Sequence, residues 1–298
     1  MNILITGGTG LIGRQLCKAL LAEGNQLTVL SRHPETVAEK CGLEVEAFAT
    51  LEDWKPDRVF DAIINLAGEP IVDAYWSAKR KQVLWDSRVT LTEKLVQRIA
   101  AAKQKPKVLL SGSAVGFYGN RGDTELAESA VMGNDFAARL CNAWEQAALG
   151  AEIRGVRVCL LRTGLVLSTQ GGILGRMLLP FKLGLGARLG DGKQWMSWVH
   201  IQDYVAIVKL LLDNGRLHGS FNMTAPNPVS NAQFTQTLAH SLHRPVFFAA
   251  PGIALKWAMG ARSALLLEGQ RVLPKNIEAA GYNFIFSDLE GALKDLLG

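Results

Sequence analysis

The sequence predicts an α/β fold, a doubly wound parallel sheet with helices on both faces, and a smaller C-terminal part. Segments of strand type alternate with segments of helix type over roughly the first 165 residues. The first strand-type segment ends in a glycine cluster, and a helix-type segment begins directly after it. Such alternation is typical of parallel sheets, which bind ligands at the carboxyl ends of their strands. The composition, 48% apolar and 20% charged, is that of a globular protein. We therefore expect a Rossmann-type domain.

The glycine cluster lies in residues 1–13, where the spacing is G-x-x-G-x-x-G. Gly7 permits a sharp turn out of the strand, Gly10 leaves room for a pyrophosphate, and Gly13 permits close packing of helix on strand. The free N–H groups of the helix N-terminus attract an anion. An ordinary glycine-rich turn is the alternative, which this position after a strand makes less favourable. The predicted phosphate-binding residues are Gly7, Thr9, Gly10, Leu11, Ile12 and Gly13.

The second strand, Gln26–Leu30, leads to Ser31 and Arg32. In a dinucleotide-binding fold this strand end faces the adenosine ribose, where an acidic residue binds the 2′-hydroxyl and an arginine accepts a 2′-phosphate. Because no Asp or Glu stands here, we predict NADP(H) as the cofactor. A solvated surface arginine is the alternative.

The remaining elements of the sheet follow in order. We expect strands near 43–48, 62–66, 108–110 and 156–161, and helices over about 11–23, 75–103 and 135–149. The carboxyl ends of these strands bring three further segments to the glycine loop and Arg32, namely residues 66–68, 111–113 and 162–164. One cleft is thus predicted to hold all of them, including Gly68.

After residue 169 the chain becomes glycine-rich and basic. We expect irregular structure with a short helix to about residue 193, a helix from about 198 to 212 and a strand at 219–223. Helices near 231–242 and from 252, a strand at 245–248 and a compact tail from 270 complete the chain. Residues 1–168 with 198–225 are predicted to form the nucleotide-binding domain. Residues 169–197 and 226–298 are predicted to form the substrate-side domain.

Composition excludes several classes of function. A net charge of +5 without a basic block suits anionic small molecules and does not favour nucleic acid. Four scattered cysteines indicate reduced thiols in a cytoplasmic protein, and no apolar run is long enough to suggest a membrane span or, at the N-terminus, a signal peptide. No P-loop, nucleophile elbow or metal-ligand spacing occurs. A small-molecule substrate is expected, and the oligomeric state is left open.

These motifs resemble the extended branch of the short-chain dehydrogenase/reductase superfamily, the sugar-nucleotide epimerase type. Residues 6–13 look like its TGGTGxIG signature, 65–68 its HLAG-like element, 113–119 its serine-to-YG segment and 199–203 its VHVxD element. More narrowly, NLAGEPI at 65–71, SRV at 87–89, LLPFKLGLG at 178–186 and LEGQRVLP at 267–274 resemble an atypical "epimerase family" with a short C-terminal domain. The resemblance implies NADP-binding positions at Ser31, Arg32, Leu66, Ala67, Arg88 and Val166.

The chain departs from the superfamily at its catalytic pair. The chemistry uses a tyrosine hydroxyl whose pKa is lowered by a lysine four residues later, on the same helix face. In the helix at 135–149 the equivalent positions hold Ala137 and Cys141, which supply neither a proton nor a charge. The Y-x-x-x-K at Tyr75–Lys79 lies on a different helix, and we interpret it as coincidence.

Several residues are candidates to replace the pair. Ser113 matches the catalytic serine of the superfamily, and Tyr118 follows it in the chain. Tyr118 could point into the cleft or pack in a loop. Asp135 or Glu145 could act as a base, or serve helix-end electrostatics or a solvated face, and His200 could be structural. The cations of the glycine-rich stretch could clamp a diphosphate or face solvent, and they are Arg176, Lys182, Arg188 and Lys193.

Two functions remain open on this sequence. The first is an NADP(H)-dependent epimerase or reductase acting on a nucleotide-sugar-like or carbonyl substrate. The second is a non-catalytic NADPH-binding sensor or regulatory protein that has lost the Tyr/Lys pair.

Overall fold

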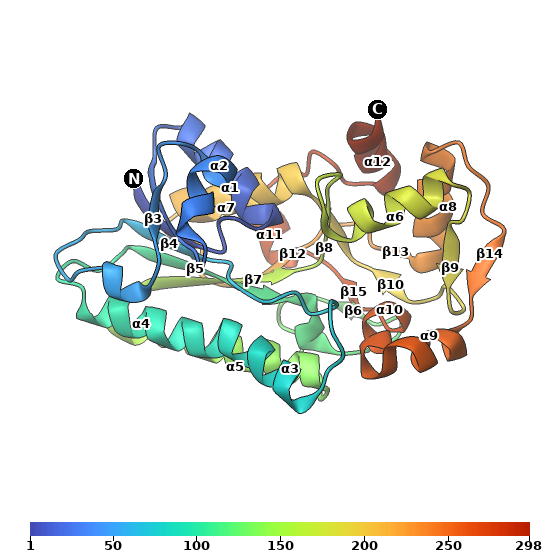
Figure 1. The fold of residues 1–298 in the computed structure, drawn as a ribbon, viewed down its shortest axis with the longest axis horizontal. Coiled ribbons are helices and arrows are strands. Elements are labelled where there is room, and N and C mark those ends of the chain that lie inside the picture. Colours follow the sequence, from blue (N-terminus) through green and yellow to red (C-terminus); the bar gives the residue numbers. More distant parts are fainter.

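A seven-stranded sheet forms the centre of the protein in a computed structural model that describes all 298 residues (Figure 1). Every neighbouring pair of strands in it is parallel. In spatial order the strands are β12 (Gly219–Met223), β7 (Arg157–Thr163), β5 (Val108–Ala114), β4 (Ala62–Asn65), β1 (Asn2–Thr6), β2 (Gln26–Leu30) and β3 (Glu46–Phe48). The predicted doubly wound parallel sheet is confirmed.

Helices cover both faces of this sheet (Figure 1). Ile3 and Ile5 of β1 point to the face covered by α1 (Leu11–Ala22), α2 (Val37–Cys41) and α7 (Ile201–Asp213). Leu4, between them, points to the opposite face, covered by α4 (Leu91–Ala101) and α5 (Phe136–Leu149). Successive strand residues alternate in direction, so a continuously apolar strand is buried on both sides. The short α3 (Ala78–Trp85) precedes α4.

The strand order reverses between β1 and β4. From β1 the chain builds outward through β2 and β3, and it then returns to place β4 on the other side of β1. The crossover connections therefore diverge at this point and leave a crevice at the carboxyl ends of the strands. The glycine loop after β1 lies at this crevice.

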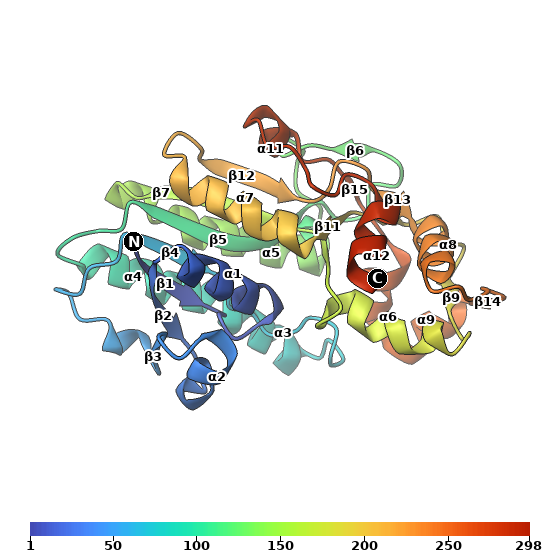
Figure 2. The same ribbon diagram turned by 90° about the horizontal axis from the view of Figure 1, so that it is seen from above.

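A second, smaller group of elements packs beside the sheet (Figure 2). Its core contains Leu174, Trp198, Phe234 and Leu293. Its helices are α6 (Gly172–Lys182), α8 (Asn231–Ser241), α9 (Gly252–Met259), α10 (Ala264–Leu267) and α12 (Leu289–Leu297), whereas α11 (Lys275–Ala279) packs on β12 at the edge of the large sheet. The small strands are β6 (Glu125–Leu126), β8 (Leu165–Leu167), β9 (Ala187–Leu189), β10 (Trp195–Met196), β11 (Trp198–His200), β13 (Val229–Ser230), β14 (Phe248–Ala250) and β15 (Arg271–Val272).

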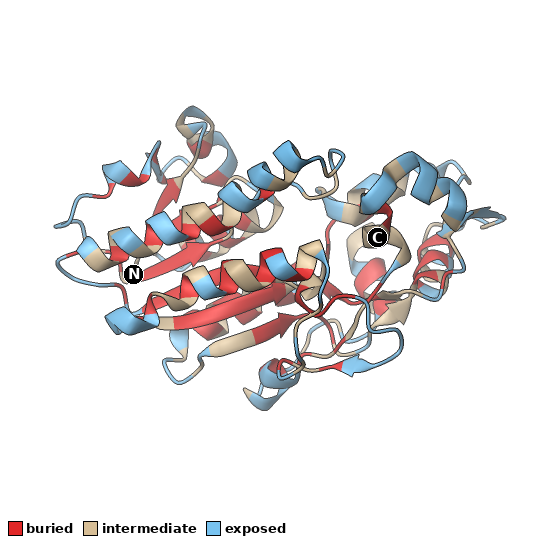
Figure 3. Ribbon diagram, turned by 90° about the horizontal axis from the view of Figure 1, so that it is seen from below, coloured by how far each residue is buried: buried red, intermediate tan, exposed pale blue.

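Burial follows the same organisation (Figure 3). The inner strands of the large sheet are almost completely buried, and the helices that cover it expose their outer faces. None of the helices combines the length and the apolar character needed to cross a membrane.

Two predicted elements differ from the structure. The long helix expected over 75–103 begins only at Ala78, because the Ser77 hydroxyl accepts a hydrogen bond from the Arg80 N–H and caps it. A π-helical turn, Asp86–Thr90, then separates α3 from α4. The strand expected at 245–248 is instead β14, at residues 248–250, where it pairs with β9. That pairing joins distant segments, so local patterns could not fix its register.

Candidate functional site

The glycine loop packs too tightly for any side chain at two of its positions. Gly7 has φ +72°, and a Cβ there would lie 2.7 Å from the Leu66 carbonyl carbon. A Cβ on Gly13 would lie 2.3 Å from the Gly7 oxygen. Gly10 precedes α1 and offers no side-chain cap, so the first N–H groups of the helix are left for another acceptor. This is the geometry of a phosphate-binding loop.

A cavity of about 570 Å³ opens beside this loop. It lies at the carboxyl ends of β1, β2 and β4. Eight predicted cofactor-binding residues line it: Gly7, Thr9, Gly10, Ser31, Arg32, Leu66, Ala67 and Gly68. Further lining residues come from the segment after β2, from α2, from the segments after β3 and β4, and from the π-helical turn and α4. Among them are Thr36, Lys40, Thr50, Glu69, Ser87 and Lys94.

The remaining predicted cofactor residues lie next to this cavity or beneath it. Leu11, Ile12 and Gly13 form the first turn of α1, with Ile12 packed on the core under the sheet. Val166 lies in β8, and its carbonyl is close to Gly172, which in turn contacts Leu11. The fold thus brings residues 166 and 172 to the glycine loop.

Arg32 forms an ion pair with a residue that the sequence analysis did not single out. Its Nη1 lies 2.5 Å from Glu69 Oε1, and Arg80 Nη1 lies 3.4 Å from Glu69 Oε2. Burial acts to raise the pKa of Glu69, but the hydrogen bonds and charges of the two arginines outweigh it and the pKa falls below its usual value. Glu69 therefore remains a carboxylate at neutral pH and competes for the Arg32 guanidinium.

Arg88 lies at the floor of the same region. Its guanidinium donates a 2.9 Å hydrogen bond to the Glu69 carbonyl and lies over the Trp144 ring, 5.4 Å from its centroid. A Cβ on Gly68 would approach the Arg88 Cζ to 2.9 Å, so the guanidinium can occupy this position only because residue 68 has no side chain. Burial lowers the pKa of Arg88, and the charge of Glu69 acts against that effect.

A buried polar network lies where β5, β7 and α5 meet. The Ser113 hydroxyl donates a 2.6 Å hydrogen bond to Glu145 Oε1. Arg162 forms a two-point ion pair with Glu145, at 2.8 and 2.9 Å, and donates a third hydrogen bond to the Tyr118 hydroxyl. Tyr118 donates in turn to Asn222 Oδ1. Every polar group in this network has a partner, as burial requires.

The two predicted catalytic residues are both members of this network. Ser113 is 4% exposed and Tyr118 is completely buried, and neither lines the 570 Å³ cavity. Burial raises the pKa of Tyr118, although the Arg162 charge acts to lower it. For Glu145 the sequence left open a base, helix-end electrostatics or a solvated face; the structure excludes the solvated face, because Glu145 is 3% exposed and forms a buried ion pair. The signal in the sequence was Arg162, a charged residue within an apolar strand segment, which indicates a buried acidic partner.

Comparison with known proteins identifies the chain. The NAD dependent epimerase/dehydratase family matches residues 3–224, and a domain of unknown function, DUF1731, matches residues 250–296. The chain belongs to this epimerase family. The Epimerase family protein YfhF of Bacillus subtilis is 36% identical, over 100% of this chain and 98% of that protein. The Epimerase family protein MW0731 of Staphylococcus aureus is also 36% identical, over 99% and 98%.

Solved structures of family members agree with the fold. The human epimerase family protein SDR39U1, solved with NADPH, is 34% identical with a TM-score of 0.90, covering 100% of this chain and 99% of that one. A nucleoside-diphosphate sugar epimerase from Corynebacterium glutamicum is 31% identical with a TM-score of 0.78, and the match covers 100% of this chain and 58% of that one. The NADPH in the human relative agrees with the cofactor predicted here.

The positions of the superfamily's catalytic pair have an identifiable packing. Ala137 and Cys141 lie on α5 opposite Gly116, where an added Cβ would be 3.5 Å from the Ala137 Cβ and 4.0 Å from the Cys141 Sγ. Burial raises the pKa of Cys141 to about 12, so the thiol is neutral at physiological pH. Neither Ala137 nor Cys141 therefore supplies a charge or a proton donor of ordinary acidity.

The other candidate residues have structural partners. Asp135 caps α5 by accepting the Ala138 N–H, and His200 caps α7 by accepting the Gln202 N–H. Tyr75 hydrogen-bonds to the Ala258 carbonyl, and its ring lies under the Arg262 guanidinium. None of the four cations of the glycine-rich stretch lines the cofactor cavity; Arg176 pairs with Asp73, and Arg188 lines a different cavity.

Proposed function

We propose that this protein is an NADP(H)-dependent epimerase or reductase acting on a nucleotide-sugar-like or carbonyl substrate. The cofactor cleft supports the NADP(H) part of the proposal. The loop at Gly7–Gly13 would hold the pyrophosphate, and Arg32 would hold the 2′-phosphate. The two positions directly after β2 hold Ser31 and Arg32 and no acidic residue that would bind a free 2′-hydroxyl, and the human relative was solved with NADPH. When bound, the cofactor would supply or accept hydride.

The substrate class rests on relatives. The Corynebacterium glutamicum relative is called a nucleoside-diphosphate sugar epimerase. The UDP-glucose 4-epimerase of Thermotoga maritima, solved with UDP-glucose, shares the fold with a TM-score of 0.81 at 17% identity. A sugar hydroxyl or a carbonyl group is accordingly the reacting group that we assign to this site.

The observation that carries the catalytic part is the Ser113–Glu145 hydrogen bond. Since Ser113 donates its own proton to Glu145, its oxygen is left to accept a proton from a substrate hydroxyl. In this proposal the substrate O–H proton moves to Ser113 Oγ while the Ser113 proton moves to Glu145 Oε1. Arg162 balances the carboxylate charge, and Tyr118 is a positioning residue that holds Arg162. The relay replaces the missing tyrosine.

Arg88 supplies the positive charge that the missing lysine cannot. Its guanidinium is close enough to Cys141 for its charge to act on that thiol, at the position of the family lysine. Arginine remains charged at all accessible pH values. Arg88 donates hydrogen bonds to the backbone carbonyls of Glu69 and Leu84. We assign to its remaining N–H groups the role of orienting the end of the cofactor that carries a ribose and a carbonyl group.

A specific observation favours a second candidate, the NADPH-binding sensor. Ser113, Tyr118, Glu145 and Arg162 satisfy one another in a buried network, and the catalytic pair of the superfamily is absent. Such a protein would bind the cofactor and change its contacts with a partner without turning over a substrate.

Single-turnover absorbance at about 340 nm separates the two functions, because hydride transfer must change this signal. The protein is loaded with NADP⁺ or NADPH and mixed with a panel of nucleotide sugars and simple carbonyl compounds. A change in the wild type that Ser113→Ala and Glu145→Gln abolish, with NADPH affinity retained, supports the relay. Tight NADPH binding with no change across the panel favours the sensor, and a change that survives in both variants contradicts the relay.

A further inference from the structure

A second cavity, of about 590 Å³, lies far from the cofactor cleft. It is lined by α8, by the chain from Arg244 to β14 and by β9, at the opposite end of the molecule from β1–β3 (Figure 2). The two cavities share no lining residue. Whatever occupies this one therefore need not compete with the dinucleotide.

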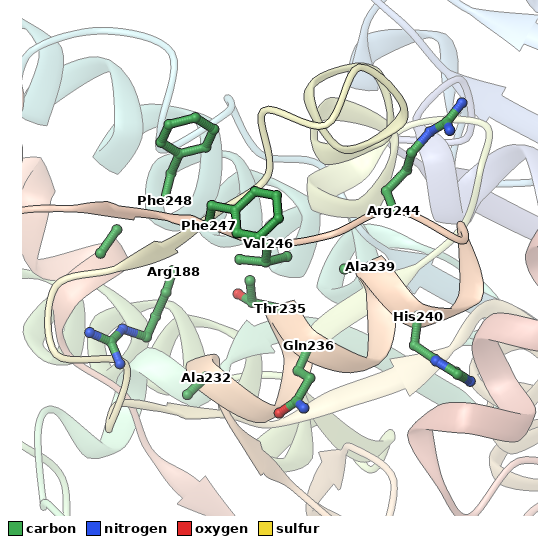
Figure 4. A pocket seen from close by; sticks show the side chains of 11 residues that line it. Arg188, Ala232, Thr235, Gln236, Ala239, His240, Arg244, Val246, Phe247 and Phe248 are labelled. Atoms are coloured by element: carbon green, nitrogen blue, oxygen red, sulfur yellow. The ribbon is translucent and has the colours of Figure 1, made fainter.

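The walls of this cavity combine apolar surface with positive charge. Figure 4 shows Val246 beside the helix that carries Thr235 and Ala239, and the Phe247 ring on the far side of Val246 from that helix. Arg188 and Arg244 lie at opposite ends of the groove. No lining residue is acidic, and the chain contains no Asp or Glu between residues 214 and 267. The cavity therefore favours an anion with an apolar body.

Arg188 is held at the cavity without a partner of its own. Its aliphatic stem crosses Gly192, where a Cβ would lie 2.4 Å from the Arg188 Cδ, and β9 fixes its backbone against β14. Its guanidinium makes no hydrogen bond or ion pair within the protein, whereas Arg244 uses its Nε to bind the Lys182 carbonyl at the end of α6. A guanidinium without a partner in the protein is suited to an anionic group of a ligand.

Thr235 provides an independent observation. The residue is 2% exposed at the cavity floor, and its hydroxyl has no hydrogen-bond partner. Threonine on a helix usually satisfies its hydroxyl by bonding back to the preceding turn. A buried hydroxyl without a partner is costly, and an oxygen atom of a ligand seated in the cavity would remove that cost.

We propose that this cavity binds an organic anion, a carboxylate or phosphate group attached to a flat apolar body. The anionic group pairs with Arg188, the apolar body lies between Phe247 and Ala239, and the Thr235 hydroxyl contacts the ligand from the floor. This site is separate from the proposed hydride chemistry and stands whether or not that chemistry occurs.

Isothermal titration calorimetry tests the site with four probes: 2-naphthoate, 2-naphthyl phosphate, neutral 2-naphthol and inorganic phosphate. We expect 1:1 binding of at least one naphthyl anion, about tenfold tighter than 2-naphthol or inorganic phosphate. The two naphthyl anions distinguish a carboxylate ligand from a phosphate ester. Equal binding of 2-naphthol would overturn the role of the charge, and equal binding of inorganic phosphate would overturn the role of the apolar body. No binding of any probe at millimolar concentration would overturn the site.

Variants locate the binding. Arg188→Gln and Phe247→Ser change exposed side chains and should each weaken binding of the naphthyl anion about tenfold. Arg216→Gln removes the same charge from an exposed arginine outside the cavity and should leave the affinity unchanged. Thr235→Val should weaken binding about threefold while leaving the fold intact, because it removes an unpartnered hydroxyl.

The opposite results exclude the proposed location. Equal affinity in Arg188→Gln and wild type, or displacement of the probe by NADPH, would place the anion elsewhere and overturn the proposal. Unchanged affinity in Thr235→Val would overturn the part assigned to that hydroxyl.

Discussion

Arg32 and Glu69 form an ion pair across the mouth of the cofactor cleft, joining the end of β2 to the segment after β4. The side chain of Arg32 is 82% exposed and that of Glu69 is 18% exposed. The arginine that we assign to the 2′-phosphate is therefore already engaged by a carboxylate in the free protein. On this assignment, NADPH affinity depends on how readily the 2′-phosphate replaces the Glu69 carboxylate as the partner of Arg32.

Replacing Arg32 tests the assignment of the 2′-phosphate. Arg32→Ala should weaken NADPH binding about tenfold and leave NADH binding nearly unchanged, because only NADPH carries the phosphate. Fluorescence titration of both cofactors measures the two effects. Equal losses for NADPH and NADH would contradict the assignment.

Replacing Glu69 tests the competition. Glu69→Gln keeps the size of the side chain and removes its charge, so NADPH binding should become severalfold tighter, and less so at high salt. NADH serves as the control because it has no 2′-phosphate to repel. Weaker NADPH binding would instead mean that Glu69 is needed to orient Arg32 and Arg80.

The buried Glu145–Arg162 ion pair should be sensitive to the loss of either partner. Arg162→Leu leaves an uncompensated carboxylate and should lower the free energy of unfolding by about 3–5 kcal/mol. The double variant Glu145→Gln/Arg162→Leu should recover part of this loss, since both charges of the pair are removed. Urea denaturation of the wild type, the two single variants and the double variant measures the coupling between the residues. Additive changes in the free energy of unfolding would argue against direct coupling.

His200 should make stability depend on pH. Burial lowers its pKa, and Asp295 and Asp203 act in the opposite direction without cancelling the effect. The unfolded chain therefore binds a proton more readily than the folded one, so the stability that neutral His200 permits is lost as pH falls through its ordinary value of about 6.5. Urea denaturation between pH 8 and 5.5 measures this loss. His200→Asn, which keeps a helix-capping acceptor, should show a smaller slope over the same interval.

The local pattern of the sequence was sufficient for the sheet and for much of the cleft. Buried strands followed by glycine, as at Ile3–Gly7 and Ile63–Gly68, identify carboxyl ends that share one edge because parallel strands run the same way. The role predicted for Arg32 follows from its position directly after β2. Each of these inferences needs only neighbours in the chain.

Partners that are distant in the chain were beyond such reasoning. The sequence left the role of Glu145 open between a base and a solvated or helix-end residue, and its ion pair with Arg162 forms only because α5 packs on β7. The same holds for Glu69, which binds an arginine 37 residues earlier.

The sequence by itself determined the doubly wound sheet, the glycine loop and the choice of a cationic residue after β2, because backbone geometry and strand periodicity are local properties. Only the tertiary structure decided which charges meet, that Ser113 donates to Glu145, and that α8 and β14 enclose a second cavity. Those features depend on side chains brought together from separate elements, whose interaction energies arise only when packing removes water from between them.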